Sequence, residues 1–312
     1  MKAPLGKASP PRVVALVLTY NSGSQVLECL ESLAACHFDG LEVLVVDNAS
    51  TDDTVSLIRD RFPDLDVHVA PRNLGFGGGC NLGVEATARD GAQYVLLVNP
   101  DATVAPDMLG TLVAFMDAHE TAGAVGPKTY STEPMPDGSP RLLYAGAFRG
   151  RLPLRQRIPG IGQADSSPAT EPLEVDYIWG HGMLLRVAAF EAVRGFDTDY
   201  FMYCEDLDLC VRLAREGYSL WCVPAAIMWH DAPDGARAIR SEAWRWRLKA
   251  DGMAIFHRKH HGPLTGRCLS FCTALVEAAQ LLRHGHWRAL RHQLVANLAH
   301  ALGLGSKGKP AS

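Results

Sequence analysis

The first 126 residues alternate short apolar runs with segments of helical periodicity. Runs of consecutive apolar residues predict strands buried on both faces, because a strand with one face in water alternates apolar and polar residues. Five such strands are predicted, at residues 13–18, 43–46, 67–69, 95–98 and 124–125. Strands of this kind joined by helices predict an α/β fold with a mostly parallel sheet covered on both sides.

Apolar residues spaced three or four positions apart mark the helices between these strands. The three stripes are Val26, Leu30 and Leu33, then Val55, Ile58 and Phe62, and then Met108, Leu112, Phe115 and Met116. Ser50 is predicted to cap the second helix, with Asp53 three residues later as in a capping box. The third helix is predicted to begin at Pro106, because proline is favoured in the first turn.

Beyond residue 130 the pattern changes twice. Residues 131–176 are rich in proline, glycine and serine and predict a long surface loop, with room for a short hairpin or a lid. Residues 238–312 predict helices only, and 269–282 have one apolar face. We therefore predict two units, an α/β domain over residues 10–236 and a basic, amphipathic helical tail over residues 237–312.

The net charge of −4 conceals an asymmetry. Residues 237–312 hold 13 Lys and Arg against 3 Asp and Glu, which leaves 17 against 31 for the rest of the 312-residue chain. A basic tail on an acidic body indicates either a solvated helix face or a surface that meets phosphate, anionic lipid or another acidic partner. Nucleic acid is disfavoured as a partner, because the rest of the chain is acidic.

The eight cysteines favour a reducing compartment. None of them is in C-x-x-C spacing and several lie within apolar runs, so buried thiols are predicted rather than disulfides or a zinc site. The first twelve residues lack the apolar core of a signal peptide, and no stretch approaches the ~20 apolar residues of a membrane span. These features predict a cytoplasmic protein.

Four predicted strands are followed by polar, chemically suggestive sequences. They are TYN at 19–21, DNASTD at 47–52, PRNLGFGGGCN at 71–81 and NPD at 99–101. Ligands of parallel sheets bind at the carboxyl ends of the strands. Each sequence alone also suits a turn or a helix cap, but four in succession along one edge predict a binding site.

The stretch GFGGGCNLG differs from a dinucleotide-binding loop. Such a loop follows the first strand and precedes an acid by about 20 residues, whereas this stretch follows the third predicted strand. It also lacks the Lys-Ser/Thr pair of a phosphate-binding loop. We expect it to let backbone approach a ligand, to open a helix over residues 79–90, or to form a plain glycine-rich turn.

A second acidic cluster lies within DYFMYCEDLDLCVRLAREGY. Glu205, Asp206 and Asp208 fall at a predicted helix start, where the helix dipole favours carboxylates. Asp208 is also spaced to form an i, i+4 ion pair on the surface. His230 ends an apolar run, and Asp101 is the obvious partner for it in a metal site.

The chain contains, in this order over residues 12–232, VLTYNSG, VVDNASTDDT, NLGFGGGCNLG, LLVNPDATV, GHGMLLRVAAFEAVRGFDTDYFMYCEDLDLCVRLAREGY and WH. This set resembles glycosyltransferase family 2, whose members are inverting enzymes with the GT-A fold, and is most similar to its rhamnosyltransferase-like branch. The resemblance implies a Rossmann-like GT-A domain followed by a C-terminal helical extension.

The resemblance gives the acids specific roles. Family members hold a divalent cation against the diphosphate of a nucleotide-sugar through an Asp-x-Asp motif, which reads NPD here because Asn99 replaces the first acid. The metal is therefore expected to rest on Asp101 with His230 as a further ligand, a donor set that suits Mg²⁺ or Mn²⁺. Asp206 is expected to be the general base, supported by Glu205.

The other implied site residues form two groups. Those expected to bind the donor are Thr19, Tyr20, Asn21, Asp47, Asn48, Arg72, Asn73, Gly75 and Asn99. Those expected to frame the acceptor or the sugar are Trp179, Gly180 and His181. Asp47 is expected to contact a pyrimidine base, whereas Trp179 could stack on a sugar or be a core residue.

Together these features imply transfer of one sugar, or a few, by a single displacement with inversion. Processive members carry Q-x-x-R-W and membrane spans, but WRWRL at 244–248 lacks the glutamine. We expect L-rhamnose to pass from dTDP-rhamnose to a lipid-linked or polysaccharide acceptor, with the basic tail on the inner face of an anionic membrane. A UDP-galactofuranose or UDP-N-acetylglucosamine donor, a catalytically weak scaffold that binds a partner transferase, and a nicotinamide-dependent oxidoreductase are the alternatives.

Overall fold

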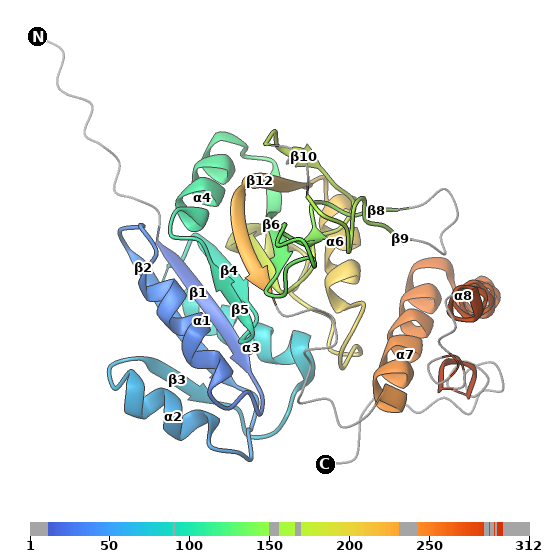
Figure 1. Ribbon diagram of the computed structural model, residues 1–312, viewed down its shortest axis with the longest axis horizontal. Helices are drawn as coiled ribbons and strands as arrows, with labels where there is room; N and C mark the ends of the chain where they lie inside the picture. The colour runs from blue at the N-terminus through green and yellow to red at the C-terminus, as the bar shows by residue number, and fades with distance from the viewer. Residues whose placement is uncertain are drawn as a thin grey trace, which may run out of the picture.

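The fold is built on one central sheet with helices on both faces (Figure 1). The computed structural model describes residues 12–89, 91–149, 156–165, 170–230, 242–283, 287, 290 and 292–295. The strand order in the central sheet is β10-β12-β6-β11-β4-β1-β2-β3, with β5 paired to β12 and β7 paired to β6.

The N-terminal half of the sheet is parallel, as the apolar runs predict. It consists of β1 (Val13–Thr19), β2 (Leu41–Asp47), β3 (Asp66–Val69) and β4 (Tyr94–Val98). All five residues of β4 are buried, because helices cover both faces of this strand. The four strands end at the same edge, which places the polar sequences that follow them side by side.

The other half of the sheet is mixed. Its strands are β5 (Ala102–Val104), β6 (Ala122–Ser131), β7 (Leu142–Tyr144), β10 (Leu173–Glu174), β11 (Gly182–Arg186) and β12 (Ser219–His230). β11 lies antiparallel between β4 and β6, while β12 runs parallel to β6. The register of β12 shifts between Val223 and Ile227, around Pro224, which has no N–H to offer a ladder.

The segment 131–176 contains more regular structure than the predicted loop. β7 pairs with β6, β10 pairs with β12, and β8 (Phe148–Arg149) forms a short hairpin with β9 (Gln156–Arg157). Asp165 ties this segment to β6, because its Oδ2 lies 3.1 Å from Lys128 Nζ and accepts from the Tyr130 hydroxyl at 2.7 Å. The Lys128 side chain is only 3% exposed. Paired polar groups like these let a proline-rich segment pack against a sheet.

The helices divide between the two faces. They are α1 (Gln25–Ala34), α2 (Thr54–Arg61), α3 (Gly75–Arg89), α4 (Met108–Ala118), α5 (Val187–Ala192), α6 (Glu205–Arg215), α7 (Glu242–His261) and α8 (Pro263–Arg283). The predicted stripes of α1, α2 and α4 join one hydrophobic core with the sheet. Residues of α3, α5 and α6 form a second core on the opposite face, and Phe256 of α7 belongs to it.

Two predicted helix starts are wrong. The second helix begins at Thr54 rather than just after Ser50, because the Ser50 hydroxyl is bonded to Asp47 Oδ1 (2.5 Å) and is not available as a cap. Asp52 instead accepts from the Thr54 N–H at 3.1 Å. The third helix begins at Met108, two residues after Pro106, and Pro106 provides its carbonyl to His37 N–H (2.9 Å).

The glycine-rich stretch lies within α3, which begins at Gly75 rather than at residue 79. Its glycines allow close packing. A Cβ on Gly79 would lie 2.4 Å from Leu18 Cδ1, and one on Gly83 would lie 2.3 Å from Leu16 Cδ1. Gly75 has a φ of +77° and meets the Phe201 carbonyl, where any side chain would clash. The stretch therefore serves helix–sheet packing.

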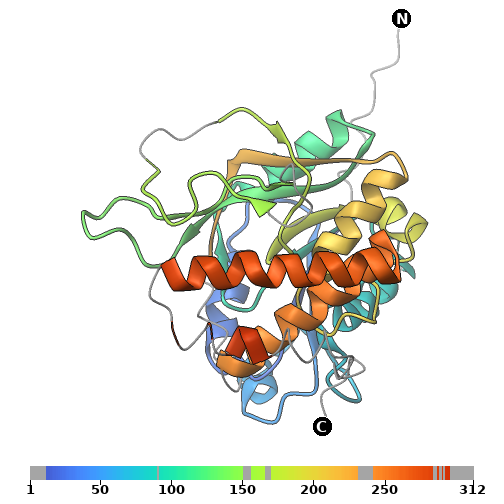
Figure 2. The same ribbon diagram turned by 90° about the vertical axis from the view of Figure 1, so that its right-hand side faces the viewer.

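The C-terminal helices α7 and α8 form a hairpin beside α6 (Figures 1 and 2). α7 contacts the α/β domain and α8 lies outside it. No helix in the described part of the chain is both long enough and apolar enough to span a bilayer. The predicted boundary at residue 236 lies outside the described residues.

Candidate active site

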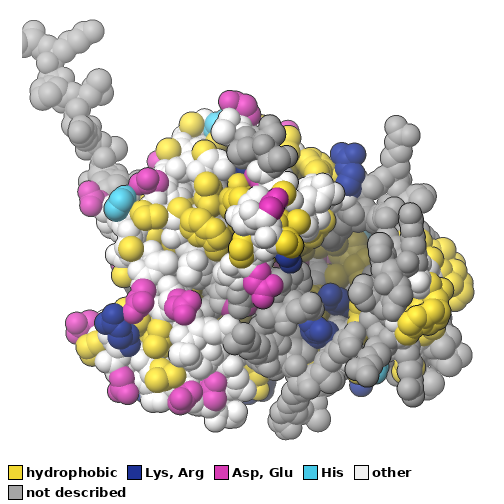
Figure 3. All heavy atoms as spheres, viewed as in Figure 1, with side chains coloured by type: hydrophobic (Ala, Val, Ile, Leu, Met, Phe, Trp, Pro, Cys, Tyr) yellow, Lys and Arg dark blue, Asp and Glu magenta, His cyan; other side chains and the backbone are white. Residues whose placement is uncertain are grey.

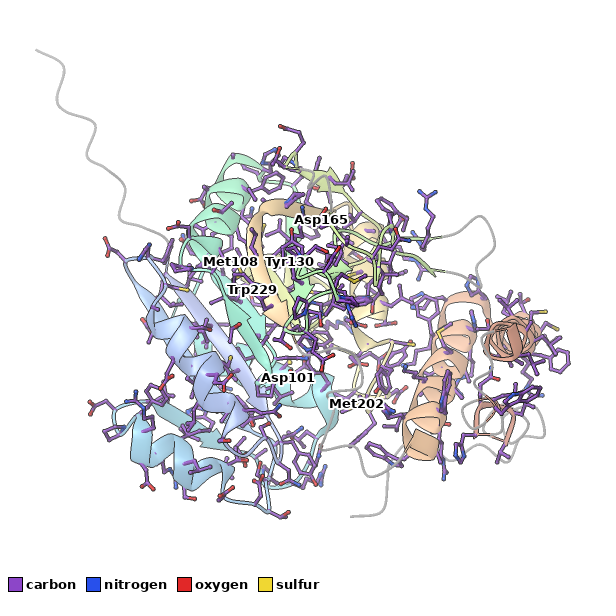
Figure 4. All side chains as sticks on the ribbon, in the orientation of Figure 1. Asp101, Met108, Tyr130, Asp165, Met202 and Trp229 are labelled. Carbon is purple, nitrogen blue, oxygen red and sulfur yellow. The ribbon has the colours of Figure 1, made fainter. Side chains whose placement is uncertain are left out.

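The polar sequences at the strand ends meet at one edge of the sheet. The register pairs Thr19 with Asp47, so the ends of β1 and β2 are adjacent, and β4 ends next to β1. His230 ends β12 at this same edge, which also receives the start of β11. In Figure 4, Asp101 and Met202 lie toward the same end of the sheet. The predicted donor, metal and catalytic groups are thus brought to one edge.

The loops after β1 and β2 hold each other in place. Asp47 is fully buried, and its carboxylate accepts from the Ser50 N–H (2.9 Å) and hydroxyl (2.5 Å). Asn21 Oδ1 accepts from the Thr51 N–H at 2.8 Å. Asn21 and Ala49 have φ values of 50° and 65°, so both turns are sharp. Thr19 and Asp47 are both buried at the ends of their strands, while Tyr20 beside them is half-buried.

A second loop closes against the first through amide side chains. Asn48 Oδ1 accepts from the Leu74 N–H (2.8 Å), and its Nδ2 donates to Asn73 Oδ1 (3.1 Å) and to the Gly75 carbonyl (3.0 Å). Three of the predicted donor-binding residues therefore form one connected unit. Arg72 is exposed next to it, with its charge toward solvent.

Asp101 and His230 form the only predicted metal pair, and the structure brings them together. His230 Nε2 lies 3.1 Å from Asp101 Oδ1 and 3.2 Å from Asn99 Nδ2. Asp101 Oδ1 is buried and accepts no hydrogen bond from the described residues. Its contact with His230 is close enough for an ion pair but is not aligned as a hydrogen bond. A carboxylate oxygen and an imidazole nitrogen converging in this way suit a divalent cation.

This pair would leave most of a cation's coordination sphere to other ligands. No group of three His, Cys, Asp or Glu side chains with metal-binding geometry occurs in the described part of the chain. A hard cation takes six or more ligands, and oxygen atoms of a substrate diphosphate suit the remaining positions. The donor set thus fits a metal that arrives with the substrate.

Residues 179–181, which are expected to frame the acceptor, lie between the Asp101–His230 pair and Asp206. The Asn99 N–H donates to the His181 carbonyl at 3.1 Å, and the His181 ring stacks on His230 with centroids 4.7 Å apart. Burial, reinforced by the neighbouring His230, lowers the pKa of His181 well below its ordinary value. Trp179 is half-buried, and its ring lies 5.5 Å from the ring of His181 and 5.6 Å from that of Tyr144.

Asp206 is held by hydrogen bonds at the start of α6. Its Oδ2 accepts from the Gly180 N–H (3.1 Å), its Oδ1 accepts from the Leu207 N–H (2.8 Å), and the Tyr177 hydroxyl adds a further bond. Asp206 is partly buried, whereas Glu205 is 5% exposed. A buried Glu205 oxygen, Oε2, has no hydrogen-bond partner among the described residues.

These environments push the two carboxyl groups apart in pKa. Burial, and then the charge of Asp206, raises the pKa of Glu205 well above its ordinary value. Burial also raises the pKa of Asp206, but the donors from Gly180, Tyr177 and Leu207 oppose the change. Because hydrogen bonds favour the charged form, Asp206 is the easier of the two carboxyl groups to ionise. A neutral acid beside an ionised one is an arrangement typical of acid–base sites.

A family comparison shows which family the chain belongs to. The model described as "Glycosyl transferase family 2" matches residues 15–194, more than half of the chain. The chain belongs to glycosyltransferase family 2. The N-acetylglucosaminyl-diphospho-decaprenol L-rhamnosyltransferase of Mycobacterium tuberculosis H37Rv is 31% identical over 234 residues, which cover 69% of this chain and 74% of that protein. Rhamnosyltransferase WbbL of Escherichia coli K12 is 29% identical over 249 residues, with coverage of 76% and 90%.

A solved structure supports the fold of this glycosyltransferase. The mannosyltransferase PcManGT of Pyrobaculum calidifontis, in complex with GDP-Man and Mn²⁺, matches with a TM-score of 0.56 and 20% sequence identity. The match covers 94% of this chain and 87% of that protein. The predicted GT-A fold is thereby confirmed, with a helical C-terminal region.

The backbone just before α6 of this glycosyltransferase is strained. Tyr203 and Cys204 have φ values of 70° and 69°, a left-handed conformation that non-glycine residues rarely adopt. The α7 helix covers this turn closely, because a Cβ on Gly252 would lie 2.5 Å from the Tyr203 carbonyl oxygen. Packing of this kind can hold a strained turn, and this turn sets the direction of Glu205 and Asp206.

The structure also adds residues to the site that sequence reasoning missed. Ser50 bonds Asp47, and the Asp-x-x-Ser spacing is a turn signal that could have revealed it. Tyr177 bonds Asp206 from a segment with no recognisable motif. His260 of α7 lies 2.7 Å from Asp208, and both side chains are almost fully buried. The i, i+4 spacing of Asp208 predicted an ion pair on the surface, but Asp208 is buried.

Proposed function

We propose that this glycosyltransferase moves L-rhamnose from dTDP-rhamnose to a lipid-linked acceptor, by single displacement with inversion at the anomeric carbon. Both relatives are named as rhamnosyltransferases, and the name of the Mycobacterium tuberculosis protein also gives L-rhamnose and a lipid-linked acceptor. The single observation that carries the mechanism is the partly buried Asp206 carboxylate, which accepts from the Gly180 and Leu207 N–H groups at the same edge as Asp101 and His230.

On the donor side, two loop units would bind different parts of the nucleotide-sugar. Tyr20 and Asn21 face the nucleoside, while the buried Thr19 and Asp47 support them from behind, Asp47 through the loop that it holds at Ser50. The unit of Asn48, Asn73 and Gly75, together with Arg72 and Asn99, lies toward the diphosphate. Arg72 is exposed, and its planar guanidinium group suits hydrogen bonds to phosphate oxygens.

Asp101 and His230 would hold the Mg²⁺ or Mn²⁺ ion, with Asn99 beside them. When bound, such an ion stabilises the negative charge that develops on the leaving diphosphate. The stacked His181 fixes the ring of His230 from one side, and Thr129 fixes His181 in turn through a 2.8 Å hydrogen bond. This support keeps the imidazole nitrogen directed at Asp101.

On the acceptor side, Asp206 removes the proton of the attacking hydroxyl. The hydroxyl oxygen bonds to the anomeric carbon as the bond from that carbon to the diphosphate oxygen breaks, and the proton passes to Asp206. Glu205 stays protonated and leaves the negative charge on Asp206, because two adjacent buried carboxylates cannot both ionise readily. Trp179 and Gly180 frame the acceptor between Asp206 and the metal pair.

The proposal also places the protein at the cytoplasmic face of a membrane, where a lipid-linked acceptor would be available. The excess of 13 basic over 3 acidic residues in 237–312 supports attraction to anionic lipid.

The test is a transfer assay with dTDP-rhamnose, Mn²⁺ and a lipid-diphosphate-linked N-acetylglucosamine acceptor. Asp206→Asn should lower kcat by about 10²–10⁴-fold with little change in folding, because it removes the base and keeps the shape. Glu216→Gln, on an exposed acid at the other end of α6, should leave the rate unchanged. Transfer only from a UDP-hexose would overturn the rhamnose assignment. Equal rates for Asp206→Asn and wild type would overturn the base assignment, and no transfer by the folded wild type would favour a binding scaffold.

A further inference from the structure

A stripe of large apolar side chains runs along the solvent side of α8. It consists of Leu264, Phe271, Leu275 and Leu282, which are 78%, 53%, 53% and 47% exposed. Their spacing of seven, four and seven residues places them on one face of the helix, over a length of about 27 Å. We call this set the outer stripe of α8. Figure 2 shows α8 lying across the surface, and Figure 3 shows apolar side chains gathered at that side of the molecule.

The hairpin itself does not use this face. α8 packs on α7 through its other side, where Thr273 Oγ1 lies 3.1 Å from His257 Nε2. Gly266 provides the closest approach, since a Cβ there would lie 2.8 Å from the backbone of Arg258. The outer stripe is therefore surplus to the packing of the hairpin. Contiguous exposed apolar surface of this kind marks an interaction site.

The charge around the stripe indicates which partner it fits. Residues 237–312 carry 13 basic and 3 acidic residues, and Arg267, which lies on α8 between Leu264 and Phe271, is exposed. Pairing of two α8 helices would bring these like charges together, which disfavours a second copy of this chain. An anionic lipid surface provides both an apolar layer for the stripe and negative charge for the basic residues.

We propose that the outer stripe of α8 inserts into an anionic bilayer surface, with the helix lying in the plane of the interface. The acidic body, with 17 basic and 31 acidic residues over residues 1–236, is repelled by the same surface. The molecule therefore has one orientation, with the hairpin toward the membrane. This inference deepens the proposed function, because it assigns the surface by which a lipid-linked acceptor is approached.

The hairpin also couples this surface to the catalytic helix. His260 of α7 pairs with Asp208 of α6, and Lys259 pairs with Asp197 and Asp199 in the segment that leads to α6. Phe256 is buried in the same core as residues of α6. α7 is thus fixed rigidly between α8 and the start of α6. A bilayer that holds α8 therefore sets the position of Asp206 relative to the membrane.

The experiment is co-sedimentation of the full-length chain with vesicles of phosphatidylcholine alone or with added phosphatidylglycerol. Wild type should bind the anionic vesicles and release them as salt increases. The double variant Phe271→Ser/Leu275→Ser should bind about tenfold more weakly or worse, because two apolar side chains no longer enter the interface. The matched control is Ile161→Ser/Leu173→Ser, on two residues of the α/β domain that are each 42% exposed, and it should bind like wild type.

The outcomes separate this inference from the proposed function. Sedimentation requires no catalysis, so it is measured even if dTDP-rhamnose is not the donor. The stripe variant should also retain wild-type turnover of a short-chain, water-soluble acceptor, which shows that it is folded. Equal vesicle binding by wild type and the stripe variant would overturn the proposal. So would a dimer in analytical ultracentrifugation that the stripe variant abolishes, because the stripe would then contact a second copy.

Discussion

Replacing Gly83 by alanine should destabilise the protein, although alanine is the better helix former. The new Cβ would lie 2.3 and 2.8 Å from the two methyl groups of Leu16 and 3.0 Å from Val46 Cγ2. Leu16 and Val46 are 1% and 0% exposed, so neither can move into solvent. Overpacking of this kind costs about 1–3 kcal/mol. The helix gains about 1 kcal/mol from alanine, and we expect a net loss of up to about 2 kcal/mol.

Gly110 provides the matched control, because it lies within α4 where a Cβ would have no contact closer than the His37 carbonyl oxygen at 3.9 Å. Gly110→Ala should therefore stabilise the protein by about 1 kcal/mol. The two variants should differ by about 1–3 kcal/mol in the free energy of unfolding, since the propensity gain is common to both and the clash is not.

The assay is urea unfolding followed by far-ultraviolet circular dichroism, with the slope against denaturant compared among the variants. Equal stability for Gly83→Ala and Gly110→Ala would refute the packing account of the glycine-rich stretch. If Gly83→Ala instead kept its stability and lost donor binding, the glycines would serve the ligand rather than the contact of α3 with the sheet.

The remaining predictions concern the catalytic helix. Glu205→Gln should gain stability over wild type as pH rises, and melting temperatures against pH measure this. Because the folded state raises the pKa of Glu205, its contribution to stability is complete below its ordinary pKa of 4.5 and is lost as pH rises through the folded pKa. Melting temperatures of wild type and variant that change in parallel above pH 5 would contradict a raised pKa for Glu205. His260→Ala should cost about 1–3 kcal/mol, because Asp208 loses a buried partner but keeps Arg212. It should also lower kcat more than it weakens donor binding, whereas His261→Ala, on an exposed neighbour, should change neither.

The strands and the polar edge could be predicted because their signals are local. Residues 95–98 are apolar because helices cover both faces of β4, and NPD follows because the edge beyond it binds ligands. The four strand-end sequences meet for the same reason, since parallel strands end together. Glu205 and Asp206 are candidate catalytic acids because a helix-start pattern and a family motif coincide at these positions.

Other parts of the site could not be predicted, because they depend on contacts between distant segments. His260 lies 52 residues after Asp208, and nothing in its own sequence indicates a buried partner. From the sequence Ser50 suits a helix cap as well as a turn, and only the folded structure shows that its hydroxyl donates to Asp47. The glycines resembled a ligand loop, whereas side chains of β1 and the Phe201 carbonyl require their small size. The antiparallel entry of β11 likewise follows from tertiary packing.

The most direct test of the account is calorimetric titration of dTDP-rhamnose into wild type and Asp101→Asn, each with and without Mn²⁺. Wild type should bind only with Mn²⁺, and Asp101→Asn should bind about 30-fold more weakly or worse, since the loss of a charged ligand costs about 2 kcal/mol. Asp206→Asn should bind like wild type, because the base does not hold the donor. Tight binding that ignores both Mn²⁺ and the Asp101 substitution would contradict the assignment of the Asp101–His230 pair to the diphosphate.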